Sequence, residues 1–251
     1  MAFSNDPPIV PLKWPDGIHP NGQELQAAFS TTAFTSPFSR SSQTQELPGG
    51  RFMLSATFPP LREELTRRWR AFFGKLHGAA GRFFFRAEIT DRPIPDLGAA
   101  EPFRLKPLTA DSERFTADRT DITIDRTVTV AERRASAIAG STASTIRAST
   151  SEGVGSLFLE AGRHVSFDRD GWRYLGLVVD DVIVQAGGVL QIRVEPPLRA
   201  LPAAGAPLHI QCPTGIFALT DDDQGRLSVG LGRFASPSFT AVEAHDPRFT
   251  I

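Results

Sequence analysis

One segment, Leu61–Leu76, constrains the fold most because it carries the pattern of a single amphipathic helix. Pro59-Pro60 ends the preceding strand, and a proline can open a helix because its missing N–H would have no partner there. Acidic residues occupy the first turns and basic residues come later, which suits the helix dipole. A helix over about 60–77 must bury its aromatic face against a sheet or a neighbouring subunit. The residues of that face have the spacing of one helical side: Leu61, Leu65, Trp69, Phe72, Phe73 and Leu76.

The residues before this helix predict a turn-rich loop followed by a strand. Serines and prolines within Ser36–Gly50 favour turns, and Gly49-Gly50 permits a sharp reversal. Leu25–Phe34 is an expected strand, whereas residues 1–24 contain five prolines and fit equally an arm laid along another surface and a frayed end. Arg51–Phe58 has strand periodicity with one apolar face: Phe52, Leu54, Ala56 and Phe58.

The remainder of the chain reads as short strands. In Arg82–Ile89, three consecutive phenylalanines indicate a strand covered on both faces. Asp91–Pro107 has the composition of a connection, and Ala135–Gly155 fits either a loop or a weak edge strand. The spacing of the later strands is typical of a small β-barrel or sandwich, so the expected fold class is mainly β with one amphipathic helix. The expected strands are Asp121–Val130, Leu157–Ala161, His164–Asp168, Trp172–Val184, Gly188–Val194, Leu208–Cys212, Gly215–Leu219, Arg226–Leu231 and Ser238–Glu243.

Composition argues against several classes of partner. The chain has 27 basic and 28 acidic residues with no basic run, which gives nucleic-acid binding little support. A single cysteine, Cys212, excludes an internal disulfide and a cysteine-based metal cluster. No apolar run approaches the roughly 18 residues that a membrane helix needs, and no signal peptide is recognisable. We therefore expect synthesis in the cytoplasm and no membrane insertion.

No pattern of catalytic residues emerges, so we expect no enzymatic activity, cofactor or metal. There is no G-x-S-x-G elbow and no H-E-x-x-H pair among the scattered histidines. Asp180-Asp181 and Asp221–Asp223 lack the alternating spacing of a calcium loop and favour solvated turns. Trp172 and Tyr174 fall on one strand face, where they form either a stacking platform for a sugar or, more commonly, part of a core.

The order of several short motifs resembles the distal tail proteins of long-tailed phages, which also occur in phage-like gene transfer particles. The resemblance covers most of residues 30–90 and 157–244, and residues 104–155 lie outside it. The motifs are Thr35-Ser36-Pro37, Gln43-Thr44, Leu47-Pro48-Gly49, Phe58-Pro59-Pro60, Leu159, Ala161-Gly162, Pro196–Arg199, Pro213–Leu219, Ser238-Phe239 and Ala241–Ala244.

This resemblance implies a homo-hexameric ring at the virion tail tip, assembled in the cytoplasm of a host bacterium. The ring would join the tail tube protein to the tail-tip hub protein. Residues 1–103 and 207–251 would form a belt domain around an inserted β-barrel module at 104–206. The helix with its flanking strands, and the loop Ser36–Gly50, would contact the next subunit. The alternative function is a carbohydrate-binding module that uses Trp172 and Tyr174 to contact host surface glycans.

Overall fold

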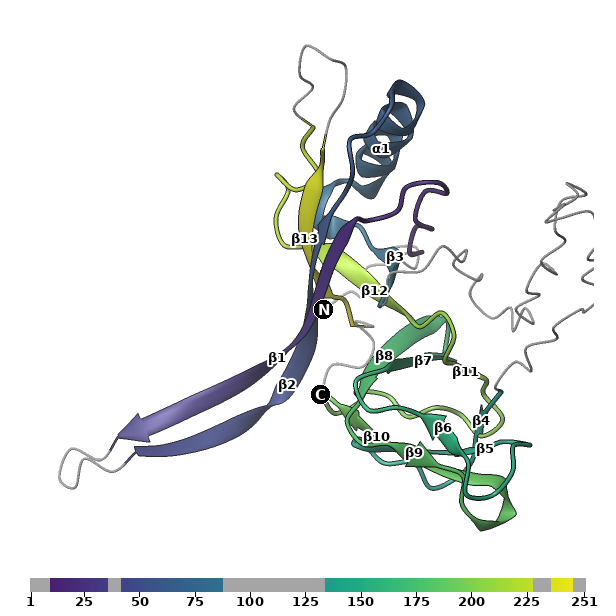
Figure 1. Cartoon of the computed structure of the whole chain (residues 1–251). Helices are drawn as coiled ribbons and strands as arrows, with labels where there is room; N and C mark the ends of the chain where they lie inside the picture. Colours follow the sequence, from purple (N-terminus) through teal and green to yellow (C-terminus); the bar gives the residue numbers. More distant parts are fainter. Residues whose placement is uncertain (1–9, 36–41, 88–133, 228–235, 246–251) are drawn as a thin grey trace, which may run out of the picture.

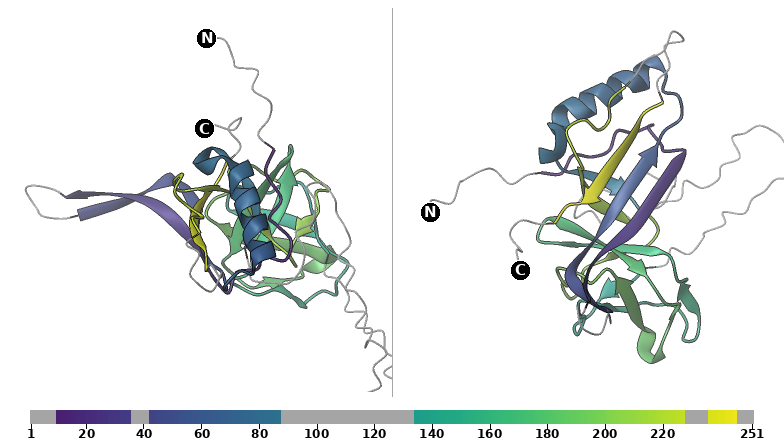
Figure 2. Two further views of the ribbon diagram at one scale, coloured as in Figure 1. Left: turned by 90° about the horizontal axis from the view of Figure 1, so that it is seen from above. Right: turned by 90° about the vertical axis from the view of Figure 1, so that its left-hand side faces the viewer.

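The computed structural model describes residues 10–35, 42–87, 134–227 and 236–245. These residues form a mainly β structure with one α-helix, which confirms the predicted fold class. They build a five-stranded sheet, a six-stranded sheet that curls into a nearly closed barrel, and a two-stranded ribbon (Figure 1). The helix lies at one end of the molecule and the barrel at the other, with the five-stranded sheet between them (Figure 2).

The five-stranded sheet is antiparallel throughout, in the order β1-β2-β13-β12-β3. It is strongly curled. Gln23, on the edge strand β1, donates from Nε2 to the carbonyl oxygens of Arg86 and Ala87 at the opposite edge, at 2.7 and 3.0 Å. The strands are β1 (Gly22–Thr35), β2 (Ser42–Thr57), β3 (Phe83–Arg86), β12 (Thr214–Leu219) and β13 (Ser238–Glu243).

The hairpin of β1 and β2 is longer than the sequence predicts. The turn-rich loop expected over Ser36–Gly50 is wrong from residue 42 onward, because β2 begins at Ser42 and Gly49-Gly50 lie inside it. Ala28 pairs with Arg51 and Ser30 with Leu47, so one residue of β1 faces three of β2. Such a bulge lets a strand accommodate proline and glycine without reversing.

Helix α1 (Glu63–Leu76) packs its apolar face on the five-stranded sheet. Its Trp69 ring meets Phe58 at 4.9 Å between centroids, and Phe72 meets Phe83 at 5.8 Å. His77 ends the helix in the left-handed conformation, and a single 3₁₀ turn, η1 (Gly78–Ala80), follows. The predicted helix is therefore confirmed.

The N-terminal arm supplies the centre of this helix–sheet core. Trp14 is buried and its Nε1–H donates to the carbonyl of Ile18 at 2.8 Å. Leu12 forms a parallel bridge with Phe83, which attaches the arm beside β3. Residues 10–20 are therefore an arm laid along another surface and not a frayed end.

The barrel sheet has the order β11-β7-β8-β10-β5-β4, and its first and last strands approach each other. The N–H of Ala137 donates to Ala206 and that of Leu208 to Ala135, at 2.8 and 2.9 Å, which nearly closes the barrel. The segments are β4 (Ser136–Ala137), β5 (Thr145–Ser149), β7 (His164–Arg169), β8 (Trp172–Val178), β10 (Val189–Glu195) and β11 (Leu208–His209), with the ribbon β6 (Leu157–Leu159) and β9 (Val182–Ile183) and the turn η2 (Ala186–Gly188).

Some predicted strands need correction here. The single strand expected over Trp172–Val184 is split into β8 and β9, because the chain turns between residues 178 and 182. Ala135–Gly155 contains two short strands, and the strand expected over Asp121–Val130 lies outside the described residues. Of the strand expected over Arg226–Leu231, only the first two residues are described, and they are not in a strand.

The barrel is built from a stretch of chain that interrupts the five-stranded sheet. Strands β3 and β12 are direct neighbours in that sheet, yet every strand of the barrel falls between them in sequence. Leu208 and His209, at the end of this stretch, pair with β7 of the barrel. This arrangement is compatible with an insertion, and the division at residues 103 and 206 stays a prediction.

Candidate interaction surface and module junction

The outer part of the β1–β2 hairpin is a two-stranded arm that leaves the body of the molecule (Figure 1). We call Ser30–Thr35 with Ser42–Leu47 the hairpin arm. Strand β13 pairs with β2 only as far as Met53, so within the described residues the arm has no third strand. An isolated two-stranded hairpin is marginally stable in water, and an unpaired strand edge is a template for another chain. Phe29, at the base of the arm, is 50% exposed.

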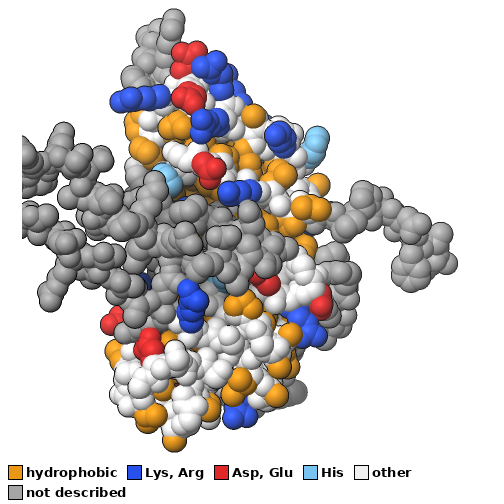
Figure 3. Space-filling view, turned by 90° about the vertical axis from the view of Figure 1, so that its right-hand side faces the viewer, with side chains coloured by type: hydrophobic (Ala, Val, Ile, Leu, Met, Phe, Trp, Pro, Cys, Tyr) orange, Lys and Arg blue, Asp and Glu red, His pale blue; other side chains and the backbone are white. Residues whose placement is uncertain are grey.

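The apolar face of α1, by contrast, is committed to this chain's own core. Trp69 is fully buried, and its Nε1–H donates to the carbonyl of Gly225 at 2.8 Å. Basic and acidic side chains lie together over the top of the molecule, where the solvent side of α1 is found (Figure 3). The apolar face of α1 therefore packs on the sheet of its own chain and is not free to bind a neighbouring subunit. Leu61, Phe72 and Leu76 are buried with Trp69, and Leu65 and Phe73 are partly buried.

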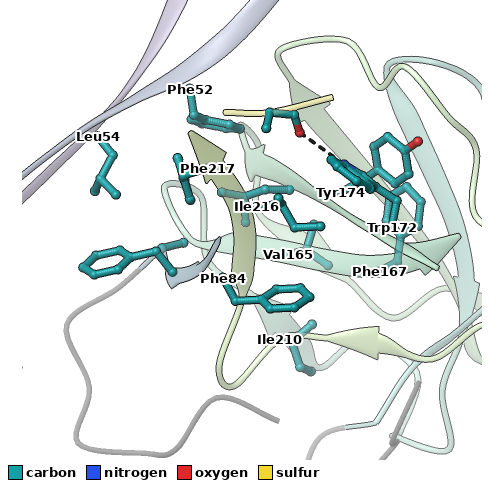
Figure 4. Close-up of a cluster of buried hydrophobic side chains, with 14 of the residues drawn as sticks. Phe52, Leu54, Phe84, Val165, Phe167, Trp172, Tyr174, Ile210, Ile216 and Phe217 are labelled. Carbon is teal, nitrogen blue, oxygen red and sulfur yellow. Dashed lines mark hydrogen bonds between the residues drawn. The ribbon is translucent and has the colours of Figure 1, made fainter. Parts of the chain in front are cut away.

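Trp172 and Tyr174 do not form a stacking platform for a sugar. They are only 6% and 4% exposed, so neither ring is available to stack on a ligand. Trp172 donates from Nε1 to the carbonyl of Ala244 at 3.1 Å, and Tyr174 stacks on Phe167 (Figure 4). Both faces of β8 are covered because β12 of the other sheet packs against it. The core-packing alternative therefore describes these two rings.

We call the zone where β7 and β8 of the barrel meet β2, β12 and β13 of the five-stranded sheet the module junction. Its first polar element is an ion pair around Arg173, whose side chain is fully buried. The guanidinium donates to both carboxylate oxygens of Asp168, at 2.7 and 2.9 Å, and to the hydroxyl of Thr214 at 2.8 Å. A bidentate pair of this kind fixes geometry as well as charge.

Two further groups complete this ion-pair cluster. His209 Nε2 lies 3.2 Å from Asp168, and the Arg173 guanidinium lies 5.6 Å from the centroid of the Phe84 ring in β3. Burial by itself raises the pKa of Asp168, but hydrogen bonds and charges from His209 and Arg173 outweigh it and hold that pKa well below its usual range. Since Arg173 bonds Thr214 and lies over Phe84, the cluster ties the barrel to the five-stranded sheet.

A second polar element of the junction centres on Glu243, the last residue of β13. Its carboxylate accepts from the backbone N–H of Phe52 at 3.1 Å, and the backbone N–H of Leu175 in β8 also favours its charged form. Burial raises the pKa of Glu243 to about 7, although these N–H groups and the charge of Arg199 act in the opposite direction. Burial, and then the charges of Arg199 and Arg51, lower the pKa of His245 to about 4.

The sequence analysis did not single out Arg173 or Glu243. A signal for Glu243 does exist, since it follows Phe239 and Ala241 on the inward face at the period of a strand. For Arg173 there is none, because alternation between Trp172 and Tyr174 would place it on an outward face. The five histidines, by contrast, were noted only as scattered. In the structure His164 contacts Phe52, and His209 and His245 also lie at the junction, whereas His19 and His77 are exposed.

The described ranges contain no group of three or more His, Cys, Asp or Glu residues placed to hold a metal ion. No helix in those ranges has the length and apolar character needed to cross a membrane. No protein-family model matches the chain, and no curated protein matches its sequence.

Proposed function

We propose that this chain is a non-enzymatic structural subunit of a homo-hexameric ring at the tail tip of a long-tailed phage or a gene transfer particle. Its partners are further copies of itself, the tail tube protein and the tail-tip hub protein, and it assembles in the cytoplasm of the host. The order of the sequence motifs supports the family, and the hairpin arm is the structural observation that supports assembly. A mainly β belt with one helix and a second barrel module is the architecture that the family resemblance implies.

The hairpin arm supports assembly because it extends main-chain hydrogen-bonding groups beyond the body. Past Gln23, the outer edge of β1 has no neighbouring strand among the described residues. A second chain can satisfy such an edge by adding a strand, and a head-to-tail contact of this kind closes into a ring when the rotation allows. The segment Ser36–Gly50, expected from the sequence to contact the next subunit, contributes its residues 42–47 to this arm.

The structure changes which surface this proposal uses. The sequence predicts a subunit contact through the helix and its flanking strands, but the apolar face of α1 is buried in its own chain. The arm, and not the helix face, therefore forms the contact between subunits in our proposal. We do not propose glycan binding, since the two rings on which it depended are buried.

The experiment is to shorten the arm without disturbing the body. Replacing residues 30–47 by Asn-Gly removes the hairpin arm and leaves a six-residue loop between the paired residues Ala28 and Arg51. Native mass spectrometry should show the intact chain as a hexamer and the shortened chain as a monomer with an unchanged melting temperature.

A point variant gives a second, milder test. Phe29→Lys places a charge at the base of the arm and should weaken the ring, because edge lysines oppose strand addition. Ile183→Lys is the matched control, since Ile183 is also about half exposed (53%) but lies on the β6–β9 ribbon. A chain that stays monomeric even with its tail partners, or a ring that survives loss of the arm, contradicts the proposal.

A further inference from the structure

The end of β13 is bonded to both modules at once. The N–H of Ala244 donates to Ile216 of the five-stranded sheet at 2.8 Å, and its carbonyl accepts from Trp172 of the barrel at 3.1 Å. The Glu243 carboxylate lies beside this bridge: it accepts from the N–H of Phe52 in β2, and the N–H of Leu175 in β8 acts on its charge. Ala244 thus connects the sheet and the barrel, and the buried carboxyl group of Glu243 lies next to that connection.

The Glu243 carboxyl group is nearly inaccessible to water and has no ion pair in the described part of the chain. The residue is 7% exposed, and among the described residues no cationic nitrogen lies within 4.0 Å of its oxygens. Arg199, in the loop after β10, acts on this carboxyl group by its charge, and Arg199 and Arg51 of β2 act in the same way on His245, two residues further on. His164 in β7 contacts Phe52, whose N–H the carboxylate accepts. Arg199 Nε is itself buried without a hydrogen-bond partner.

We infer that Glu243 is a proton-sensitive latch, which holds the barrel against the five-stranded sheet when its carboxyl group is neutral and loosens the junction when it ionises. The physical reason is desolvation: a buried carboxylate loses its hydration, and neutral backbone N–H groups without an ion pair do not replace it. The neutral carboxyl group still accepts a hydrogen bond and needs no counter-charge. The inference does not depend on ring assembly.

The sign of the effect follows from linkage. The folded-state pKa of Glu243, about 7, lies above its ordinary value of 4.5. Its contribution to stability is therefore fully present below 4.5 and is lost as the pH rises through 7. Between pH 5.5 and 8.5 this shift raises the equilibrium constant for unfolding about 30-fold. His245, whose pKa is lowered, acts in the opposite direction over the lower half of this range and is best removed by His245→Asn.

The three tryptophans allow the junction to be observed separately from the core. Trp14 and Trp69 donate their indole N–H groups within the helix–sheet core, to Ile18 and Gly225, and Trp172 donates to Ala244 at the junction. Labelling the full chain with 5-fluorotryptophan gives three ¹⁹F signals, and Trp172→Phe identifies the junction signal. The signals are followed from pH 5.5 to 8.5 alongside urea unfolding.

We expect only the Trp172 signal to titrate, with a midpoint near 7, in the wild type and in His245→Asn. Adding Glu243→Gln to His245→Asn should remove this titration and abolish the 30-fold change in the equilibrium constant for unfolding between pH 5.5 and 8.5. Three outcomes overturn the inference: a wild-type Trp172 signal that is constant, one that still titrates in Glu243→Gln, or all three signals moving together. If Glu243→Gln does not fold, the wild type is compared with His245→Asn instead. A Trp172 titration that persists in His245→Asn supports Glu243 as the titrating group, and one that is lost assigns the titration to His245 and overturns the inference.

Discussion

Replacing Trp14 by alanine tests whether the N-terminal arm is part of the core. Trp14 is only 7% exposed although it lies in a proline-rich segment with no secondary structure. Its ring lies between the helix and the sheet, within 4.8–5.8 Å, centroid to centroid, of six aromatic rings: Phe58, Trp69, Phe72, Phe83, Phe85 and Phe239.

The expected loss of stability follows from the cavity that this change leaves. Truncating a buried tryptophan or phenylalanine to alanine costs about 3–5 kcal/mol. The six ring contacts and the hydrogen bond to Ile18 place Trp14→Ala toward the upper end of that range. For a chain of this size, 1 kcal/mol lowers the melting temperature by about 2–4 °C, so a decrease on the order of 10–20 °C is expected.

Thermal and urea unfolding, followed by circular dichroism, measure this loss. Val10→Ala is the matched control in the same arm, because Val10 is 75% exposed and its truncation should change stability by less than about 0.5 kcal/mol. A Trp14→Ala protein that unfolds at the wild-type midpoint would refute the packing of the arm against the sheet.

Three further substitutions test other parts of the structure. Arg173→Met removes the bidentate partner of the partly buried Asp168 carboxylate and should cost about 3–5 kcal/mol in urea unfolding, whereas a loss below 1 kcal/mol would show that the junction is hydrated. Gly225→Ala should lower the melting temperature, because Gly225 has φ +73° and an added Cβ would overlap the ring of Phe73. An unchanged melting temperature would contradict this contact between Gly225 and Phe73. The wild type should lose stability as the pH falls below 6.5 toward 4, and His245→Asn should remove this loss. The same decrease in stability at acid pH in the wild type and in His245→Asn would contradict the burial of His245.

The parts of this fold that the sequence predicts are those with a local period. Helix α1 was expected over about 60–77 and spans Glu63–Leu76, because its apolar spacing and flanking prolines are local signals. The inward residues Phe52, Leu54 and Ala56 of β2, and Phe58 directly after it, likewise follow strand alternation. Short strands ending in glycine or proline turns were also recognisable, although their ends moved by a few residues.

The remaining features depend on contacts between distant segments. Trp14 gives no periodic signal, since it is held by residues from the helix, from β3 and β13, and by Phe58 just after β2. Gly49-Gly50 has the composition of a turn, but pairing with β1 keeps it in a bulged strand. The burial of Trp172 requires β12 to pack on β8, and the hydrogen bond from Arg173 to Thr214 joins residues of two sheets. Pattern alone cannot supply such information.

The most direct test of the proposed function is the mass of the assembled protein. Native mass spectrometry of the purified chain, alone and with its tail partners, should give a species of six times 27.3 kDa. Negative-stain images of the same sample should show rings, and residues 30–47 should be required for them. A stable monomer under all these conditions, with an intact hairpin arm, would contradict the account.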